Sequence, residues 1–492
     1  MKIEIIKNKE EIKNGGILIP VFTENQNAHV GKEHIEILNG LINNKKFKGD
    51  IGEQVTINIL KEDKIFPIVF FGLGKQEELN SETIRLSLGK ALRKINEIKE
   101  EEITLNLFKS DKVCVKRMVK SIVEAALLTE YSFQKYLSKK KEFHLNKLNL
   151  INFNNEIDFE DAKLAIEEAE ILASTTILAR DLVNEPANIL GPNELAKAAE
   201  KAGEEYGFEV EVLKEDAIED LHMDAFLAVA KGSKKSPRLI VMRYFGDKDS
   251  EEILGFVGKG LTYDSGGYSI KPTDGMVTMK SDMGGSAAVI GAISAIAKSK
   301  LKINVVAVVA ACENLISGKA YKPGDIINSM GNKTIEVLNT DAEGRLTLVD
   351  AVYYAIHKEK VTKVIDIATL TGAVLVALGK DVTGLVTNNN EFLESLKKAS
   401  NMSGEKVWEL PNFPEYKKLI KSDIADLKNI GGRWAGTITA GLFIGEFVGD
   451  TPWVHMDIAG TAWKDSEESY FTKGGTGVGV RTLYYLAKSM NS

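Results

Sequence analysis

The sequence contains few cysteines and histidines, and their spacing excludes two kinds of site. Only two of the 492 residues are cysteines, Cys114 and Cys312, and both stand in apolar runs far apart in the chain. They provide neither a disulfide framework nor a zinc-finger spacing, and we expect both thiols to be buried. None of the six histidines lies in a His-Glu-x-x-His spacing, so zinc bound in the usual protease manner is unsupported.

Long apolar runs and an excess of positive charge are also missing. No segment is apolar over a length that spans a bilayer, and no charged-then-apolar leader follows Met1, so we expect a cytoplasmic protein without a membrane partner. The net charge of -7 argues against a generally basic nucleic-acid binder. A basic patch at residues 139–141 is more typical of a solvated turn or helix face than of a nucleic-acid site.

The chain is longer than most single hydrophobic cores, and its pattern predicts two α/β domains. Residues 1–160 alternate between strand-like and helical stretches and form the expected amino-terminal α/β domain. Apolar residues at helical spacing predict a linker helix at residues 161–183, which Pro186 ends. Residues 184–492 then form the second domain. The strands expected in the first domain lie at residues 55–60, 66–71 and 103–108.

Near-continuous apolar runs predict a buried sheet in the second domain. Runs of this kind are typical of strands that are covered on both faces. The best candidates for covering helices are residues 286–298 and 346–358, each directly after a polar cluster. We therefore expect a mixed sheet flanked by helices, with a metal site in loops at the carboxyl ends of its strands. The expected strands are residues 238–244, 253–257, 303–311 and 364–368.

The two polar clusters carry four carboxylates. The run NTDAEGRL at residues 339–346 places Asp341 and Glu343 two positions apart. If this run is an extended loop, both side chains point to one side and can share a cation, whereas a helix would turn them apart. The upstream cluster contributes Asp264 and Asp282 among glycines and lysines. Four such carboxylates are enough to hold two divalent ions with bridging oxygens.

Each of these residues also has a purely structural interpretation. A single aspartate beside glycine is more often a turn residue or a helix cap than a metal ligand. Arg345 can form a salt bridge within its own segment, and His455, in a strand-like run, is more typical of a structural histidine. Lys259 and Lys271 stand among glycines and apolar residues, where a buried ammonium group needs a partner. Four acidic residues in two such loops favour the metal site.

The two clusters carry a specific resemblance to a known family. Residues 339–346 resemble, position for position, the signature of the leucyl aminopeptidase family, the cytosol aminopeptidases with two metal ions. The resemblance covers most of the second domain, and it reaches the first domain only through residues 71–75. Its other segments are residues 184–188, 257–272 and 279–285 and those around His455 and Gly474.

The resemblance implies a centre of two divalent metal ions, manganese or zinc. One ion would be held by Lys259, Asp264, Asp282 and Glu343, and the other by Asp264, Asp341 and Glu343. Asp264 and Glu343 would then bridge the two ions. A lysine binds a metal only as the neutral amine, so the adjacent cations and burial would have to lower the pKa of Lys259.

The same resemblance implies catalytic and specificity roles. Lys271 would stabilise the oxyanion of the tetrahedral intermediate, and Arg345 would hold a bicarbonate ion that acts as general base. An apolar pocket would accept the first side chain of the substrate, which favours leucine-like residues. The residues of this pocket would be Met279, Thr369, Leu370, Gly372 and Ala459.

These expectations describe a metal-dependent aminopeptidase that removes amino-terminal residues, preferably leucine or other apolar ones, from peptides. The family assembles as hexamers, and the resemblance implies a homohexamer. A two-metal phosphoesterase is an alternative enzyme, because clustered carboxylates also suit phosphoryl transfer. A DNA-binding role, in addition to or instead of peptidase activity, is the alternative from another class. Some members of the family bind DNA, but the acidic balance weighs against that role here.

Overall fold

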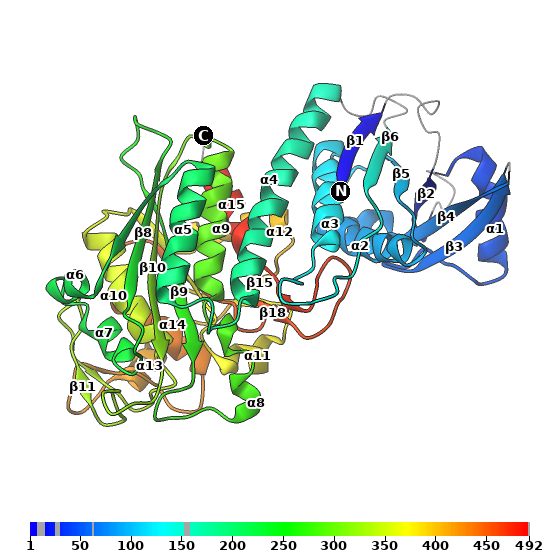
Figure 1. The fold of residues 1–492 in the computed structure, drawn as a ribbon. Helices are drawn as coiled ribbons and strands as arrows, with labels where there is room; N and C mark the ends of the chain where they lie inside the picture. The colour runs from blue at the N-terminus through cyan, green and yellow to red at the C-terminus, as the bar shows by residue number, and fades with distance from the viewer. Residues whose placement is uncertain (7–14, 25–29, 62, 152–157, 491–492) are drawn as a thin grey trace. The chain divides into compact units, whose positions relative to one another are not determined.

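The computed structural model describes residues 1–6, 15–24, 30–61, 63–151 and 158–490. The chain divides into two compact units, whose elements are labelled in Figure 1. The first unit comprises Met1–Ser174 with Asp465–Lys473, and the second comprises Thr175–Lys464 with Gly474–Ser492. Helix α4 (Phe159–Asn184) has residues in both units and includes the range expected as a helix before Pro186.

A six-stranded sheet forms the centre of the first unit. Its strands are β1 (Lys2–Ile6), β2 (Gly16–Val21), β3 (Gln54–Lys61), β4 (Lys64–Gly72), β5 (Glu102–Asn106) and β6 (Lys147–Ile151). Its helices are α1 (Lys32–Asn43), η2 (Gln76–Glu78), α2 (Ser81–Glu97) and α3 (Val115–Glu130). The strand order is β1-β6-β5-β2-β4-β3, and every pair is parallel except β3 with β4. The three strands expected in this domain correspond to β3, β4 and β5.

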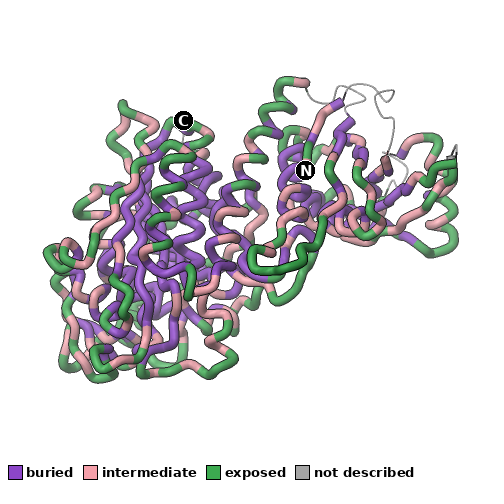
Figure 2. The backbone as a smooth tube through the Cα atoms, in the orientation of Figure 1, coloured by how far each residue is buried: buried purple, intermediate pink, exposed green. Residues whose placement is uncertain are grey.

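The second unit contains the expected mixed sheet, with eight strands. These are β7 (Glu209–Leu213), β8 (Arg238–Phe245), β9 (Leu254–Asp264), β10 (Asn304–Asn314), β13 (Lys363–Ala368), β14 (Thr383–Thr387), β15 (Val407–Glu409) and β17 (Trp453–Asp457). Their order is β15-β14-β17-β13-β9-β10-β8-β7. The central strands β10, β9, β13 and β17 pair in parallel, and antiparallel pairs flank them. Figure 2 shows these strands as a buried layer.

Helices and short strands surround this sheet. The helices are α5 (Pro192–Tyr206), α6 (Glu215–Asp220), α7 (Asp224–Ala230), α8 (Thr273–Met276), η3 (Met279–Ser281), α9 (Gly284–Lys298), α10 (Gly344–His357), α11 (Gly372–Leu378), α12 (Asn390–Ser403), α13 (Pro414–Lys417), η4 (Lys418–Ile420), α14 (Gly436–Gly445) and α15 (Val480–Met490). The short strands are β11 (Ile326–Ile327), β12 (Ile335–Glu336), β16 (Leu427–Lys428), β18 (Trp463–Lys464) and β19 (Gly474–Gly475). Within the residues described, no helix has both the length and the apolar character needed to cross a membrane.

The two helices expected to cover the sheet, α9 and α10, pack on opposite faces of it. A Cβ atom on Gly258 of β9 would lie 2.7 Å from the carbonyl oxygen of Gly285 in α9. The side chain of the next residue, Lys259, packs against Gly344 of α10 instead. A Cβ atom on Gly344 would collide with Lys259 Cε. Successive side chains of a strand point to opposite faces, so these contacts place the two helices on opposite sides of the sheet.

The structure corrects the sequence prediction at β9 and at Cys114. The loop predicted after residue 257 is wrong, because β9 continues to Asp264 and includes Lys259. Its glycines provide close packing instead of a turn, as a Cβ atom on Gly260 would lie 2.7 Å from Val309 Cγ1 of β10. Cys114 is exposed where the chain enters α3, so the prediction of a buried thiol is wrong there and confirmed only for Cys312.

A buried carboxylate fixes α10 to two neighbouring segments. Asp350 Oδ2 accepts a hydrogen bond from the Phe226 N–H at 2.9 Å, and Oδ1 accepts one from the Met330 N–H at 2.8 Å. Burial raises the pKa of Asp350 to about 7, although these backbone donors oppose the shift. Asp350 therefore titrates at a higher pH in the folded chain than in the unfolded chain, where an aspartate has a pKa of about 4.

This shift predicts a pH-dependent stability difference between the protein and Asp350→Asn. The folded state binds the extra proton between about pH 4 and 7, so the contribution of Asp350 to stability is largest at low pH and falls as the pH rises through that range. The free energy of unfolding of the unaltered protein, minus that of Asp350→Asn, should therefore be about 2 to 3 kcal/mol larger at pH 5 than at pH 8. Denaturant midpoints of both metal-free proteins at the two pH values check this. An equal gap at both pH values contradicts it.

Candidate metal centre and active site

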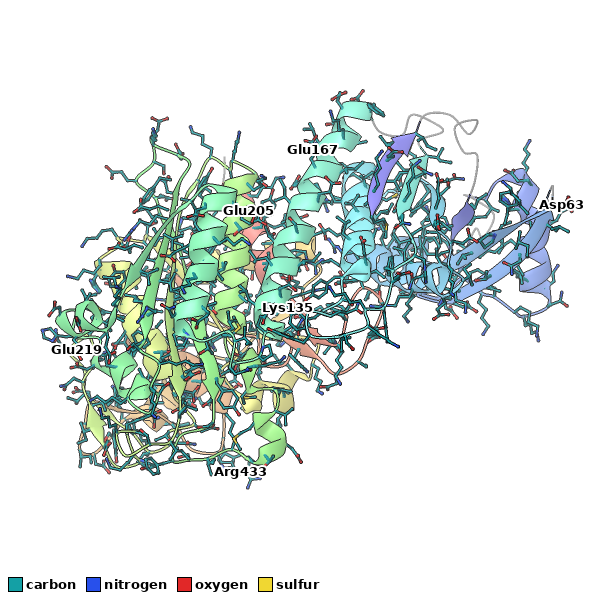
Figure 3. All side chains as sticks on the ribbon, in the orientation of Figure 1. Asp63, Lys135, Glu167, Glu205, Glu219 and Arg433 are labelled. Carbon is teal, nitrogen blue, oxygen red and sulfur yellow. The ribbon has the colours of Figure 1, made fainter. Side chains whose placement is uncertain are left out.

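The residues of both polar clusters meet at the carboxyl end of β9. Asp264 is the last residue of this strand, and Asp282 lies between η3 and α9. Asp341 and Glu343 lie in the segment that runs directly into α10, as a loop entering a helix. Acidic side chains such as Glu205 and Glu219 lie on the surface of this unit (Figure 3), whereas Asp264, Asp282 and Glu343 are buried.

Three of these carboxylates form a group that fits a metal ion. Asp264, Asp341 and Glu343 each offer one oxygen, and these oxygens all lie within 4.8 Å of one another. Glu343 Oε2 is buried and has no hydrogen-bond partner among the described residues. Leaving a carboxylate oxygen buried without a partner is costly, and a divalent cation, which prefers oxygen ligands, would remove that cost. The donor set and the unpaired oxygen therefore both suit a hard divalent ion.

Lys259 lies between the carboxylates of the two clusters. Its Nζ is 2.7 Å from Asp282 Oδ2 and 2.9 Å from Glu343 Oε1, and it donates to the Thr369 carbonyl at 3.0 Å. Burial on its own lowers the pKa of Lys259, but the surrounding carboxylates outweigh it and hold this pKa above its ordinary value. In the absence of other cations, the ammonium group thus neutralises part of the acidic cluster.

Lys271 contacts the cluster from the loop after β9. Its Nζ lies 2.8 Å from Asp264 Oδ2 and also pairs with Asp341. The Asp264 carboxylate is held from its other side, because Oδ1 accepts hydrogen bonds from Asn314 Nδ2 and the Gly266 N–H, each at 2.8 Å. Burial on its own lowers the pKa of Lys271, but the nearby carboxylates outweigh burial and hold this pKa above its ordinary value. Lys271 therefore stays charged beside the acidic cluster.

Burial and mutual repulsion make the carboxylates difficult to ionise together. Burial raises the pKa of Asp282 to about 8, and repulsion by Glu343 and Asp264 adds to this against the attraction of Lys259. Burial also raises the pKa of Asp264 and of Asp341. Positive charge bound among them would favour their ionised forms. The electrostatics of the site therefore also favour a cation.

Arg345, on the first turn of α10, is buried without an ion pair among the residues that the structure describes. Its Nη1 donates to the Asn429 carbonyl at 2.7 Å, and its Nε is buried without a hydrogen-bond partner there. Burial lowers the pKa of Arg345 to about 10. The alternative of a salt bridge within its own segment is wrong, because its guanidinium instead meets a carbonyl 84 positions away. An unpaired buried donor of this kind suits an anionic or carbonyl ligand.

The residues predicted to form the substrate pocket lie in segments next to the carboxylate cluster. Met279 begins η3, Thr369 and Leu370 lie between β13 and α11, and Gly372 is the first residue of α11. The Thr369 hydroxyl donates to Asp282 Oδ1 at 2.8 Å, which joins this segment to the carboxylates of the two polar clusters. Ala459 lies two residues after β17, the strand beside β13.

Sequence reasoning missed several residues that hold the site together. Asn314 donates to Asp264, and the Asn429 carbonyl accepts from Arg345. Asp457 accepts hydrogen bonds from backbone N–H groups of two of the three pocket segments, those of Leu370 and Ala459. Asp457 stands two residues after His455 in the same strand-like run. Side chains two positions apart in a strand lie on one face, so the run indicated that Asp457 lies on the same face as His455. The two asparagines carry no local signal, because their partners are distant in the sequence.

The arrangement combines an acidic cluster with three basic side chains, Lys259, Lys271 and Arg345. Hard divalent ions bound by the carboxylates would act as Lewis acids towards a carbonyl or phosphoryl oxygen. Lys271 can add a positive charge next to a developing oxyanion. Asp282 and Lys259 lie next to the trio of Asp264, Asp341 and Glu343, and they offer further atoms that could bind a metal ion. The site therefore suits metal-assisted hydrolysis.

Comparisons with known proteins cover both units. Residues 177–484 match the model of the "Cytosol aminopeptidase family, catalytic domain", and residues 18–140 match that of the N-terminal domain of the same family. A "Probable cytosol aminopeptidase" of Clostridium perfringens is 55% identical over 98% of both chains. One of Alkaliphilus oremlandii is 47% identical over 100% of both chains. Among solved structures, "Bottromycin maturation enzyme BotP in complex with Mn" has a TM-score of 0.84 and 28% identity, covering 97% of this chain and 99% of that one.

Proposed function

Because the chain belongs to the cytosol aminopeptidase family, we propose that it removes the amino-terminal residue from peptides with the help of two divalent metal ions. The observation that carries this proposal is the trio of buried Asp264, half-buried Asp341 and buried Glu343, with one Glu343 oxygen left without a hydrogen-bond partner in the described structure. Such a trio offers bridging oxygens, which a pair of ions needs. The manganese named with the related BotP structure supports manganese as one candidate, and zinc is the other.

The proposed ligands divide into two groups that share two residues. The first ion would be held by Lys259, Asp264, Asp282 and Glu343, and the second by Asp264, Asp341 and Glu343. Lys259 would act as the neutral amine, which requires its proton to be displaced when cations bind. When bound, the two ions supply Lewis acidity for activating water and polarising the peptide carbonyl, and an anchor for the substrate amine.

The basic residues of the chain would complete the reaction. Lys271, already charged beside Asp264, would stabilise negative charge that develops on the carbonyl oxygen during attack. Arg345 would hold a bicarbonate ion through its guanidinium, whose Nε is buried without a partner in the described structure. Bicarbonate held there would supply a general base for the hydrolysis. Asn429 would orient Arg345 for this role by accepting from Nη1.

Family membership also supports proposals for specificity, assembly and compartment. Met279, Thr369, Leu370, Gly372 and Ala459 would line an apolar pocket for the first side chain and so favour leucine and other apolar residues. We propose a homohexamer in the cytoplasm that acts on peptides.

The test is hydrolysis of leucyl amide after chelation and again after adding back manganese or zinc. We expect activity to be lost with the chelator and restored by metal, because the acidic residues alone cannot activate water sufficiently. A phosphate ester assayed under the same conditions should not be hydrolysed. Activity that survives complete metal removal, or hydrolysis of the ester alone, would contradict the proposed function.

A further inference from the structure

Asp457, at the carboxyl end of β17, holds the segment that follows β13. Its Oδ1 accepts hydrogen bonds from the N–H groups of Leu370 and Thr371 at 3.2 and 3.4 Å, and its Oδ2 accepts one from the Thr371 hydroxyl at 2.6 Å. The Ala459 N–H also donates to Oδ1, at 3.2 Å. One buried carboxylate thus joins the two segments that contribute Leu370 and Ala459 to the proposed pocket.

The same segment is bonded to the metal centre through Thr369. Its carbonyl accepts from Lys259 Nζ at 3.0 Å, and its hydroxyl donates to Asp282 Oδ1 at 2.8 Å. Residues 369–371 therefore have two proposed metal ligands on one side and Asp457 on the other. A change in their position alters the pocket relative to the centre that would bind the substrate amine.

The surroundings of Asp457 make it a fixed anchor. Burial raises its pKa, while His455 and the donors of the loop oppose that shift. His455, on the same face of β17, is itself fixed, because its Nδ1 lies 2.5 Å from Asp366 Oδ1 on the neighbouring strand. Hydrogen bonds to a carboxylate are shorter and stronger than those between neutral groups. A carboxylate with four such donors is therefore well suited to select one conformation of the loop.

We infer that Asp457 is a positioning residue that sets the selection of the first substrate side chain, an inference that rests on the proposed aminopeptidase activity. None of its hydrogen bonds in the described part of the chain goes to a proposed metal ligand. Its effect passes through the backbone of residues 369–371 and of Ala459. Alanine in its place leaves the N–H donors of the loop unpaired, whereas asparagine keeps one acceptor oxygen.

The test compares leucyl and alanyl amides with the metal-loaded enzyme and with Asp457→Ala. We expect the ratio of kcat/KM for the leucyl over the alanyl substrate to fall roughly tenfold, mainly through KM for the leucyl substrate, because a displaced pocket wall loses contacts with the larger side chain. Asp457→Asn should recover part of the ratio. The ratio does not depend on the fraction of folded enzyme, so a loss of stability alone leaves it unchanged.

Two further variants keep the test decisive. Asp350→Asn is the matched control, because Asp350 is also a buried carboxylate that accepts backbone N–H groups but holds different segments, and it should leave the ratio unchanged. If Asp457→Ala does not fold, Thr371→Val removes the hydroxyl that donates to Oδ2 and should lower the ratio by a smaller factor. The same hydroxyl also contacts the Thr437 hydroxyl and accepts from the Val374 N–H at the start of α11, so this variant is read together with Asp457→Asn. Unchanged ratios in Asp457→Asn and Thr371→Val overturn the inference. An unaltered enzyme without metal-dependent aminopeptidase activity overturns the proposed function instead.

Discussion

Glu343→Ala is expected to reduce kcat/KM for leucyl amide by a factor of at least about a thousand. Glu343 is one of the two carboxylates, with Asp264, that the two proposed metal sites would share. Its Oε1 lies 2.9 Å from Lys259 Nζ, and its Oε2 is buried without a hydrogen-bond partner in the described structure. One of its oxygens lies within 4.8 Å of oxygens of Asp264 and Asp341. Removing it takes one ligand from each proposed ion, so both affinity and the electrostatic contribution to the reaction should fall. Assays at saturating manganese or zinc measure the loss.

Two variants separate this effect from a loss of folding. Glu343→Gln preserves the volume of the side chain but removes its negative charge, and it should lose activity by a similar factor. Glu415→Ala, at an exposed position of the same unit, should retain the activity of the unaltered enzyme. Circular dichroism of all three proteins establishes whether they are folded. Folded Glu343→Ala with near-normal activity would contradict the role of Glu343 as a shared ligand.

The sequence was sufficient to predict the mixed sheet and the segments that carry the site, because both depend on local patterns. Apolar runs mark strands buried on both faces, as in β10, and short polar clusters precede the helices α9 and α10. The spacing of Asp341 and Glu343 is a local property, and the structure places their oxygens close together with one of Asp264. These features depend on residues that are close together in the sequence, so they can be predicted without knowing the tertiary contacts.

The remaining features depend on packing between distant segments, which the sequence does not show. In the sequence, Gly258 is typical of a turn. In the structure it lies in β9, where the close approach of α9 leaves no room for a Cβ atom. Arg345 has nearby carboxylates in the sequence, yet its guanidinium donates to the Asn429 carbonyl. Asp457 has no metal or substrate motif of its own and matters through the backbone of Leu370 and Thr371. Such roles follow from tertiary contacts alone.

Lys259→Met is expected to lower the metal content from two ions to one per chain and the activity at least about a hundredfold. Methionine has a similar length but cannot bind a hard divalent ion as an amine does, so the site formed with Asp282 loses a ligand. The trio of Asp264, Asp341 and Glu343 does not contain Lys259 and should still hold one ion. Metal analysis of the purified variant after dialysis, together with leucyl amide hydrolysis, measures both effects.

Lys271→Met is the matched control, because Lys259 and Lys271 both pair with carboxylates of the cluster but would have different roles. Lys271 contacts Asp264 and Asp341 as a charged group, so its loss should preserve two ions and reduce kcat about a hundredfold or more by removing stabilisation of the oxyanion. A general loss of positive charge would give both variants the same metal content. One ion in Lys259→Met and two in Lys271→Met can arise only if one lysine is a ligand and the other is not. Two ions and normal activity in Lys259→Met would show instead that its amine serves only to neutralise the metal-free cluster.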